Sequence, residues 1–353
     1  MQRAAVLATI AGALLAAQSL CAMAQTTEFR IDNVSSARKV DATRLAAGAI
    51  EFSDQTGGAG TATESALKPF DEWANRQPIE KKFLALFPNY VEPLINAKAS
   101  PGEPAQKPYT EKLYMYVAQA RFVLAKAPSA IDLSRYVTLA FLQKIDPAIK
   151  HSPIGAADVT TFKDKAGIGN ENPDRKWCTG IANAICIAST YKLEGKIPLG
   201  VMLVNKLRDT RKKVSDHIDF QGELSTLAAA DLDQGGLKEL TSLDTPVAGV
   251  LEQNIFYVNQ ILKFGKLLAV FQAHPTEANK TVVTAYMVLA IPESVLDKKK
   301  DFEKVPVLRN LVPAQVLMGQ SSFNSGNSIS AGLPVYARNE IKTIAGILAR
   351  DSK

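Results

Sequence analysis

The chain has few of the residues from which catalytic and metal sites are commonly built. Its 353 residues include three cysteines and three histidines, and neither HExxH nor GxSxG occurs. The glycine-rich stretch 56–61 lacks the lysine and the following hydroxyl residue of a P-loop, so we expect a flexible loop there. His151, His217 and His274 are far apart in the sequence. We therefore expect no metal and no cofactor.

The first 24 residues have the pattern of a cleavable secretory signal. Arg3 is the only charged residue before residue 28, and Ala4–Leu20 is almost wholly apolar. Ala22-Met23-Ala24 then supplies the small-x-small sequence of a cleavage site. The apolar core is close to the about 20 residues that span a bilayer, so a retained anchor is the competing interpretation. We predict cleavage near Ala24/Gln25, no retained transmembrane helix, and export to the bacterial periplasm or beyond the cell.

The predicted cleavage determines which cysteines the mature protein keeps. Lipidation of Cys21 would need a small residue before it, and Leu20 is not small, so we expect Cys21 to leave with the signal. Cys178 and Cys186 remain, in a compartment where disulfides persist. In one continuous helix they would be about 12 Å apart along the axis, too far to bridge. We predict a disulfide between them, with a turn in the intervening segment.

Overall composition is that of an ordinary globular protein. Hydrophobic residues make up 46% of the chain and charged residues 22%, with a formal net charge of +6. The densest basic run is Lys206–Lys213. Such a run is more often a solvated surface than a nucleic-acid site, so nucleic acid is not an expected partner.

Residues 25–150 are predicted to be mostly helical, with glycine-rich and proline-rich connectors. One helix is expected from Thr110, with apolar residues at helical spacing up to Leu124, and another from Ser129 or Asp132 to Phe141. Residues 148–175 look like a long loop, and we place a domain boundary there.

Residues 151–353 are predicted to form an α+β domain. A C-terminal amphipathic helix is expected from about Leu333, after several antiparallel strands. The strands are expected at Ile185–Leu193, Ile218–Leu227, Gly249–Gln260 (which also fits a helix), Lys266–His274 and Thr281–Ile291. In order of elements alone, this half is similar to helix-grip folds, in which a curved sheet wraps a long C-terminal helix around an apolar cavity.

Two groups of residues suggest chemistry. Cys178 and His274 could form the nucleophile and base of a thiol hydrolase, although a disulfide to Cys186 would remove the thiol. The Ser/Gly loop 319–332 runs into the last predicted helix. Backbone N–H groups at Ser325, Gly326, Asn327 and Ser328 could hold an anion there, although a plain capping loop explains them as well.

Three classes of function therefore follow from the sequence. The first is non-enzymatic binding of an apolar or amphiphilic, lipid-like molecule by the β-rich half. The second is a thiol-dependent hydrolase that uses Cys178 and His274. The third is a structural protein that contacts a component of the cell envelope through its N-terminal half.

Overall fold

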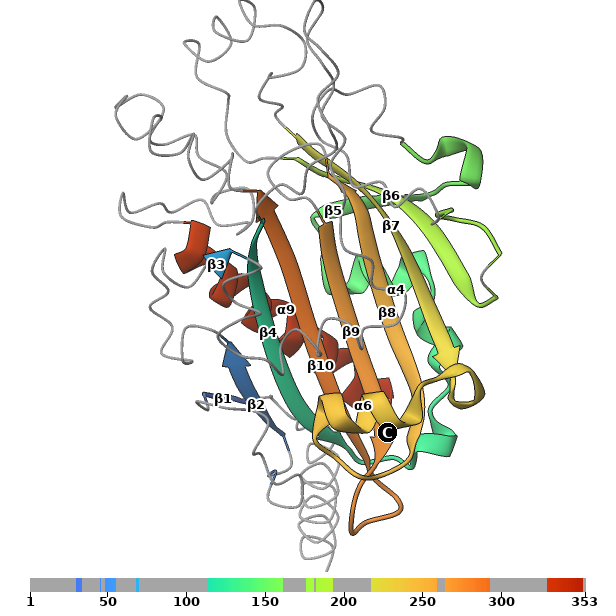
Figure 1. Ribbon diagram of the computed structural model, residues 1–353, viewed down its shortest axis with the longest axis vertical. Helices are drawn as coiled ribbons and strands as arrows, with labels where there is room; N and C mark the ends of the chain where they lie inside the picture. Colours follow the sequence, from blue (N-terminus) through green and yellow to red (C-terminus); the bar gives the residue numbers. More distant parts are fainter. Residues whose placement is uncertain are drawn as a thin grey trace, which may run out of the picture.

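A computed structural model describes the chain at residues 30–33, 45, 48–54, 68–69, 113–160, 176–180, 182–192, 217–258, 264–292 and 329–351 (Figure 1). The predicted signal, the glycine-rich stretch, the basic run and the candidate loop from Ser325 to Ser328 lie outside these residues.

One large sheet organises the described residues. Eight strands follow one another in antiparallel pairs in the order β2-β4-β10-β9-β8-β7-β6-β5, β1 pairs in parallel with β2 at one edge, and β3 pairs with the start of β4. The strands are β1 (Arg30–Asn33), β2 (Ala49–Asp54), β3 (Lys68–Pro69), β4 (Leu113–Leu124), β5 (Ile149–Pro153), β6 (Ala184–Lys192), β7 (His217–Ala228), β8 (Val247–Val258), β9 (Phe264–Ala273) and β10 (Thr281–Pro292).

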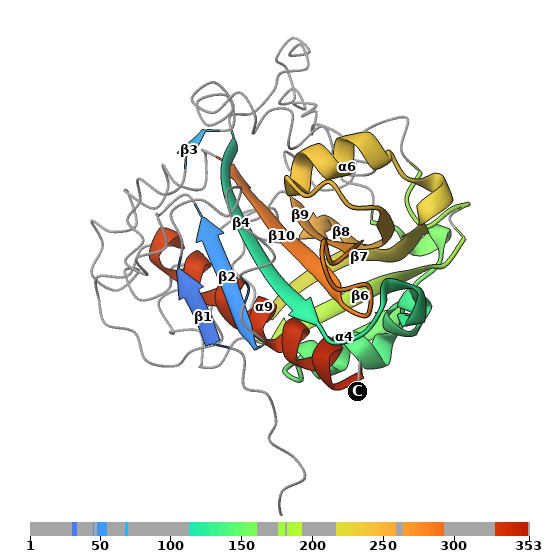
Figure 2. The same ribbon diagram turned by 90° about the horizontal axis from the view of Figure 1, so that it is seen from below.

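In the part of the chain that the structure describes, three α-helices and four 3₁₀ turns accompany the sheet. They are α4 (Leu139–Ile145), α6 (Gln234–Thr241) and α9 (Ile329–Asp351), with η4 (Pro128–Ala130), η5 (Leu133–Tyr136), η6 (Ala156–Asp158) and η9 (Ala229–Asp231). Helix α9 lies along one face of the sheet, and α6 lies on the opposite face (Figure 2). The described residues therefore form an α+β structure, as the sequence predicts.

The face beneath α9 carries the main core. Every second residue of β4 from Ala118 to Leu124 points into this core, and the neighbouring strand β10 contributes Val283, Ala285 and Met287. Helix α9 contributes Ala337, Ile341, Ala345 and Leu348, which recur every three or four residues and so lie on one side of the helix. The alanines on both sides let the helix approach the sheet closely. Burial of each larger apolar side chain stabilises the fold by about 1.5–3 kcal/mol.

Side chains of the opposite face hold the C-terminal end of α6. The Tyr286 hydroxyl donates to the carbonyl of Leu240 at 3.0 Å, and the Arg121 guanidinium donates to that of Thr241. Gln272 Nε2 donates to the Leu243 carbonyl at 2.9 Å. A cation is favourable at this end of a helix because the last carbonyls carry partial negative charge. Burial nevertheless lowers the pKa of Arg121, whose side chain is fully enclosed.

The five predicted C-terminal strands are confirmed as β6 to β10, and the closing helix is confirmed as α9. The predicted helix from Thr110 to Leu124 is wrong, because most of it is strand β4, paired with both β2 and β10. Strand β4 is covered on both faces, so its apolar residues do not alternate cleanly and can be mistaken for a helix.

The other N-terminal predictions also need correction. Residues Ser129 to Phe141 contain two 3₁₀ turns and the start of α4, whose N-cap is Thr138, with its hydroxyl accepting from the Phe141 N–H at 3.1 Å. The loop predicted at 148–175 contains β5, which pairs with β6. A mostly helical N-terminal half is thus not supported by the described residues. Strands from both sides of residue 150 share one sheet, and the domain boundary between 25–150 and 151–353 stays a prediction.

Replacement of Arg121 by alanine should destabilise the fold substantially. The change removes the donor to the Thr241 carbonyl and leaves that buried carbonyl without its partner, which costs about 1–3 kcal/mol before the lost packing is added. We expect the free energy of unfolding in urea to fall by about 3 kcal/mol. Lys238→Ala is the control, since the Lys238–Asp244 ion pair of α6 is largely exposed and should contribute less than about 1 kcal/mol.

The free energy of unfolding should fall as the pH rises from mild acid to mild alkali, because of Glu340 on α9. Burial, and to a lesser extent the negative charge of Asp146, raises the pKa of Glu340 from 4.5 to about 8. The folded state therefore keeps a proton that the unfolded state releases between these pH values. The resulting stabilisation is complete below pH 4.5 and is lost as the pH rises toward 8, at up to about 1.4 kcal/mol per pH unit.

Urea unfolding measured from pH 5 to pH 8.5 in roughly half-unit steps tests this pH dependence. Glu340→Gln should flatten the profile, since glutamine has no proton to lose, whereas Glu239→Gln on the exposed side of α6 should not. A profile that is equally steep in Glu340→Gln would contradict the assignment.

Candidate functional site

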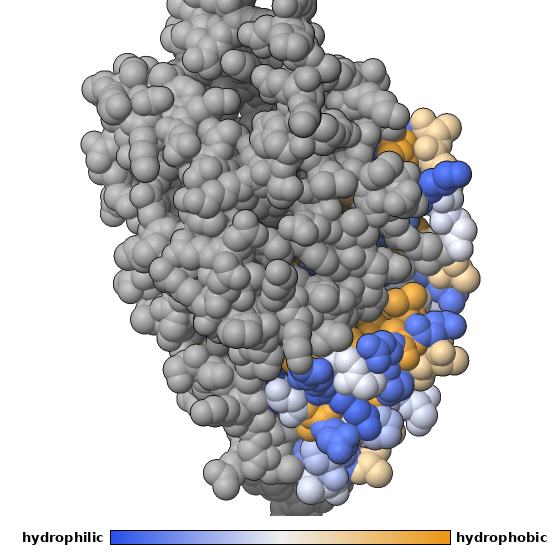
Figure 3. Space-filling view, viewed as in Figure 1, coloured by the Kyte–Doolittle hydropathy of each residue, from blue (hydrophilic) through white to orange (hydrophobic). Residues whose placement is uncertain are grey.

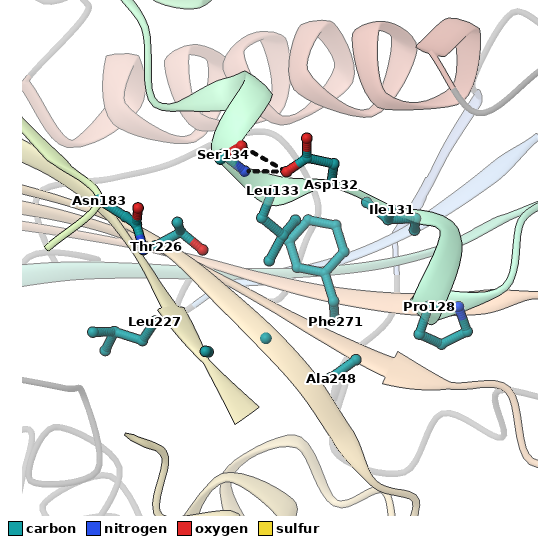
Figure 4. Close-up of a pocket in the computed structure, with 12 residues that line it drawn as sticks. Pro128, Ile131, Asp132, Leu133, Ser134, Asn183, Thr226, Leu227, Ala248 and Phe271 are labelled. Carbon is teal, nitrogen blue, oxygen red and sulfur yellow. Dashed lines mark hydrogen bonds between the residues drawn. The ribbon is translucent and has the colours of Figure 1, made fainter. Parts of the chain in front are cut away.

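A pocket of about 250 Å³ opens between the sheet and the segment that joins β4 to α4. We call residues 125–138 the strap; it contains η4 and η5, which contact β9 and β8 respectively. The strap contributes Pro128, Ile131, Asp132, Leu133 and Ser134 to the lining, and the strands contribute Thr226, Leu227, Ala228, Ala248, Gly249 and Phe271. Asn183, just before β6, completes it (Figure 4).

Leu133 fixes the strap on the sheet. A Cβ atom at position 249 would lie 2.7 Å from Leu133 Cδ1, closer than real Cβ contacts allow, so glycine is what lets Leu133 sit directly on β8. Leu133 also packs against the main core. In Figure 4 its side chain faces the ring of Phe271, and together they form the apolar centre of the pocket.

The rim of the pocket is polar. Asp132 Oδ1 accepts hydrogen bonds from the Ser134 hydroxyl at 2.6 Å and from the Ser134 N–H at 3.1 Å. These two bonds hold the pKa of Asp132 below its usual 3.8, so the carboxylate is charged at neutral pH. The Thr226 hydroxyl, in contrast, donates to the Val250 carbonyl of the neighbouring strand at 2.9 Å.

A pocket with an apolar centre and a polar rim suits a small amphiphile. Ligand pockets in proteins typically enclose about 300–1,000 Å³, and an engineered apolar cavity of about 150 Å³ holds benzene. At about 250 Å³ the pocket can take a short apolar chain but not a large lipid. On the face seen in Figure 3, hydrophobic side chains of the described residues lie in small groups among hydrophilic ones.

The predicted disulfide is confirmed. Cys178 and Cys186 are joined, with their Cα atoms 5.6 Å apart. The backbone N–H of Cys178 donates to Glu223 Oε2 at 3.0 Å, and Trp177 stacks on Phe256 with 4.7 Å between ring centroids. A Glu223 carboxylate oxygen lies within 4.8 Å of both sulfurs, as a metal ligand would. The bonded sulfurs offer no thiolate, however, so the oxidised protein has no thiolate site for a metal here.

The structure does not bring Cys178 and His274 together. Cys186 lies in a cross-strand row with Glu223, Asn254 and Lys266. His274 follows β9 eight residues beyond Lys266, which is about 26 Å at the usual rise of a strand. There its Nδ1 accepts from the Thr276 and Glu277 N–H groups and shapes the turn into β10. The thiol-hydrolase hypothesis therefore has neither a free thiol nor an adjacent base.

The pocket residues were missed at the level of sequence, apart from Asp132 as a helix start and Gly249 as a strand start. Leu133, Asn183, Gly249 and Phe271 are separated by up to 138 residues, and no local pattern connects them. Gly249 at the start of a predicted strand was the available signal, because glycine in a strand can indicate a close approach of another group.

Comparisons with known proteins give little guidance. No family model matches the chain, and no curated protein matches it. The crystal structure of human STARD10 covers 70% of this chain and 75% of its own at a TM-score of 0.26 and 8% identity. The human StarD13 (DLC2) lipid transfer and protein localization domain matches over 62% of this chain and 82% of its own chain, with a TM-score of 0.22 and 8% identity. Likeness at these TM-scores carries no argument. Within the described residues, no helix has the length and hydropathy needed to cross a membrane.

Removal of the disulfide should weaken the fold without abolishing it. In the chain-entropy picture, closing a loop with a separation of 8 residues stabilises a protein by about 2.5 kcal/mol. We expect the Cys178→Ser/Cys186→Ser double variant to lose about that much in urea unfolding. Addition of a dithiol reductant should destabilise the wild type similarly and leave the double variant unchanged. Equal stability of variant and wild type would contradict this.

Proposed function

We propose that the protein is an exported, non-enzymatic binder of an apolar or amphiphilic small molecule, and that the pocket beneath the strap is its site. The observation that carries this proposal is the lining itself: an apolar centre built on Leu133 and Phe271, bordered by Asp132, Asn183 and Thr226. An apolar chain can leave water there while its polar end stays at the rim.

The packing of the core favours this position over the centre of the sheet. Beneath α9 the main core is buried and includes alanines of β4 and β10. The strap spans the ends of β7, β8 and β9 and leaves room beneath it. A ligand in this pocket would contact η4 and η5 and would not displace α9.

Gly249→Ala should weaken ligand binding. The added methyl group would displace Leu133 Cδ1 from its place against β8, and overpacking of this kind costs about 1–3 kcal/mol. We expect about tenfold weaker binding of 1-octanol, measured by isothermal titration calorimetry. Gly235→Ala is the matched control, since its added Cβ would meet only Asp233 Oδ1 at an ordinary 3.6 Å.

Native mass spectrometry of the full chain, purified from cell envelopes without detergent, gives an independent test. A small amphiphile should accompany the wild type and the Gly235→Ala variant, and its fraction should fall in Gly249→Ala. A protein that carries nothing from the envelope and does not bind 1-octanol would overturn the proposal.

A further inference from the structure

We propose that the side-chain amide of Asn183 selects a hydrogen-bonding polar end of the ligand that is not anionic, and that the Cys178–Cys186 disulfide positions Asn183 for this role. The inference rests on the ligand-binding function proposed above and gives the chemical class of ligand for the same pocket.

Asn183 reaches the pocket from the loop that the disulfide closes. It stands between the two cysteines, directly before β6, and its backbone carbonyl accepts the Thr226 N–H at 3.2 Å. Thr226 is itself a lining residue, so this bond fixes Asn183 against the wall of the pocket. Figure 4 shows the two residues side by side, with Leu133 and Phe271 beyond them.

Two residues of this loop have left-handed backbone conformations. Asn183 has a φ of 57° and Cys178 a φ of 63°, both in the left-handed region. Asparagine tolerates this region better than most residues, but non-glycine residues in it are uncommon. The disulfide holds the Cα atoms of the two cysteines 5.6 Å apart and so limits the conformations open to the loop. Without it, Asn183 can relax and move away from Thr226.

The chemistry of the rim determines which polar end fits. The Asn183 side chain is exposed and makes no hydrogen bond to the part of the chain that the structure describes. A carboxamide offers two donor hydrogens and one acceptor oxygen, so it can pair with a hydroxyl group in either direction. The charged Asp132 on the strap side of the same pocket disfavours an anionic end. A neutral end such as an alcohol satisfies both conditions, and so does a cationic ammonium.

Three eight-carbon probes that differ only at the polar end test the selection. 1-Octanol, octanoate and octylammonium are titrated into the oxidised full chain by calorimetry. We expect 1-octanol to bind at least about fivefold more tightly than octanoate. Asn183→Gly keeps the left-handed backbone but removes the amide, and should weaken 1-octanol about fivefold, the effect of one neutral hydrogen bond, with octanoate unchanged. Asn183→Asp should shift the preference to octylammonium.

Reduction with dithiothreitol tests the positioning role. It should weaken 1-octanol binding to the wild type by about as much as Asn183→Gly does, and it should not weaken the Asn183→Gly variant further. Far-ultraviolet circular dichroism of the reduced protein should still show the folded spectrum. The positioning role would be overturned if reduction weakened 1-octanol binding to Asn183→Gly as much as it weakens binding to the wild type, or if reduction unfolded the protein. Either result would assign the disulfide to global stability.

The probes also separate this inference from the proposed function. If none of the three binds the wild type, the proposed function fails. If all three bind equally and Asn183→Gly behaves like the wild type, the function stands and the selection by Asn183 is overturned.

Discussion

The close contact between α9 and the sheet is the constraint on which the rest of the architecture depends. Alanines 118, 120 and 285 on the strands and Ala337 and Ala345 on the helix belong to one buried core, and such small side chains allow close packing. The pocket described above lies at the ends of β7 to β9, where the covering element is the strap instead of a helix.

The opposite face of the sheet is closed by polar contacts instead of small apolar ones. Arg121, Tyr286 and Gln272 reach from central strands to backbone carbonyls at and beyond the end of α6. Each of these side chains is nearly or fully buried, so its polar atoms need hydrogen-bond partners. The last carbonyls of α6 have no hydrogen-bond donor within the helix, so they in turn need these side chains. Both faces of β4 and β10 are thus enclosed, and these strands form the rigid centre from which the pocket is positioned.

Elements bounded by local signals in the sequence were predicted correctly, whereas contacts made across the sheet were not. Strands β6, β7, β9 and β10 were predicted because turns bound them and β-branched residues fill them. The two cysteines were paired because they are the two that remain after cleavage of the predicted signal, in a compartment where disulfides persist. Strand β4 was missed because Arg121 and Ala118 lie on different faces that are both buried, which removes the alternation that identifies a strand. The candidate pair Cys178 and His274 failed because sequence offered no way to measure their separation across the sheet.

Local patterns in the sequence therefore determined the α+β character of the described residues from β6 to α9, since this follows from periodicity. The number of cysteines left after the predicted cleavage indicated the pairing of Cys178 with Cys186. Tertiary structure alone decided that β4 is a central strand, that Leu133 rests on Gly249, and that Asn183 faces the same pocket as Phe271. These contacts join residues far apart in the chain. They depend on which strands become neighbours, and that is settled only when the whole sheet assembles around α9.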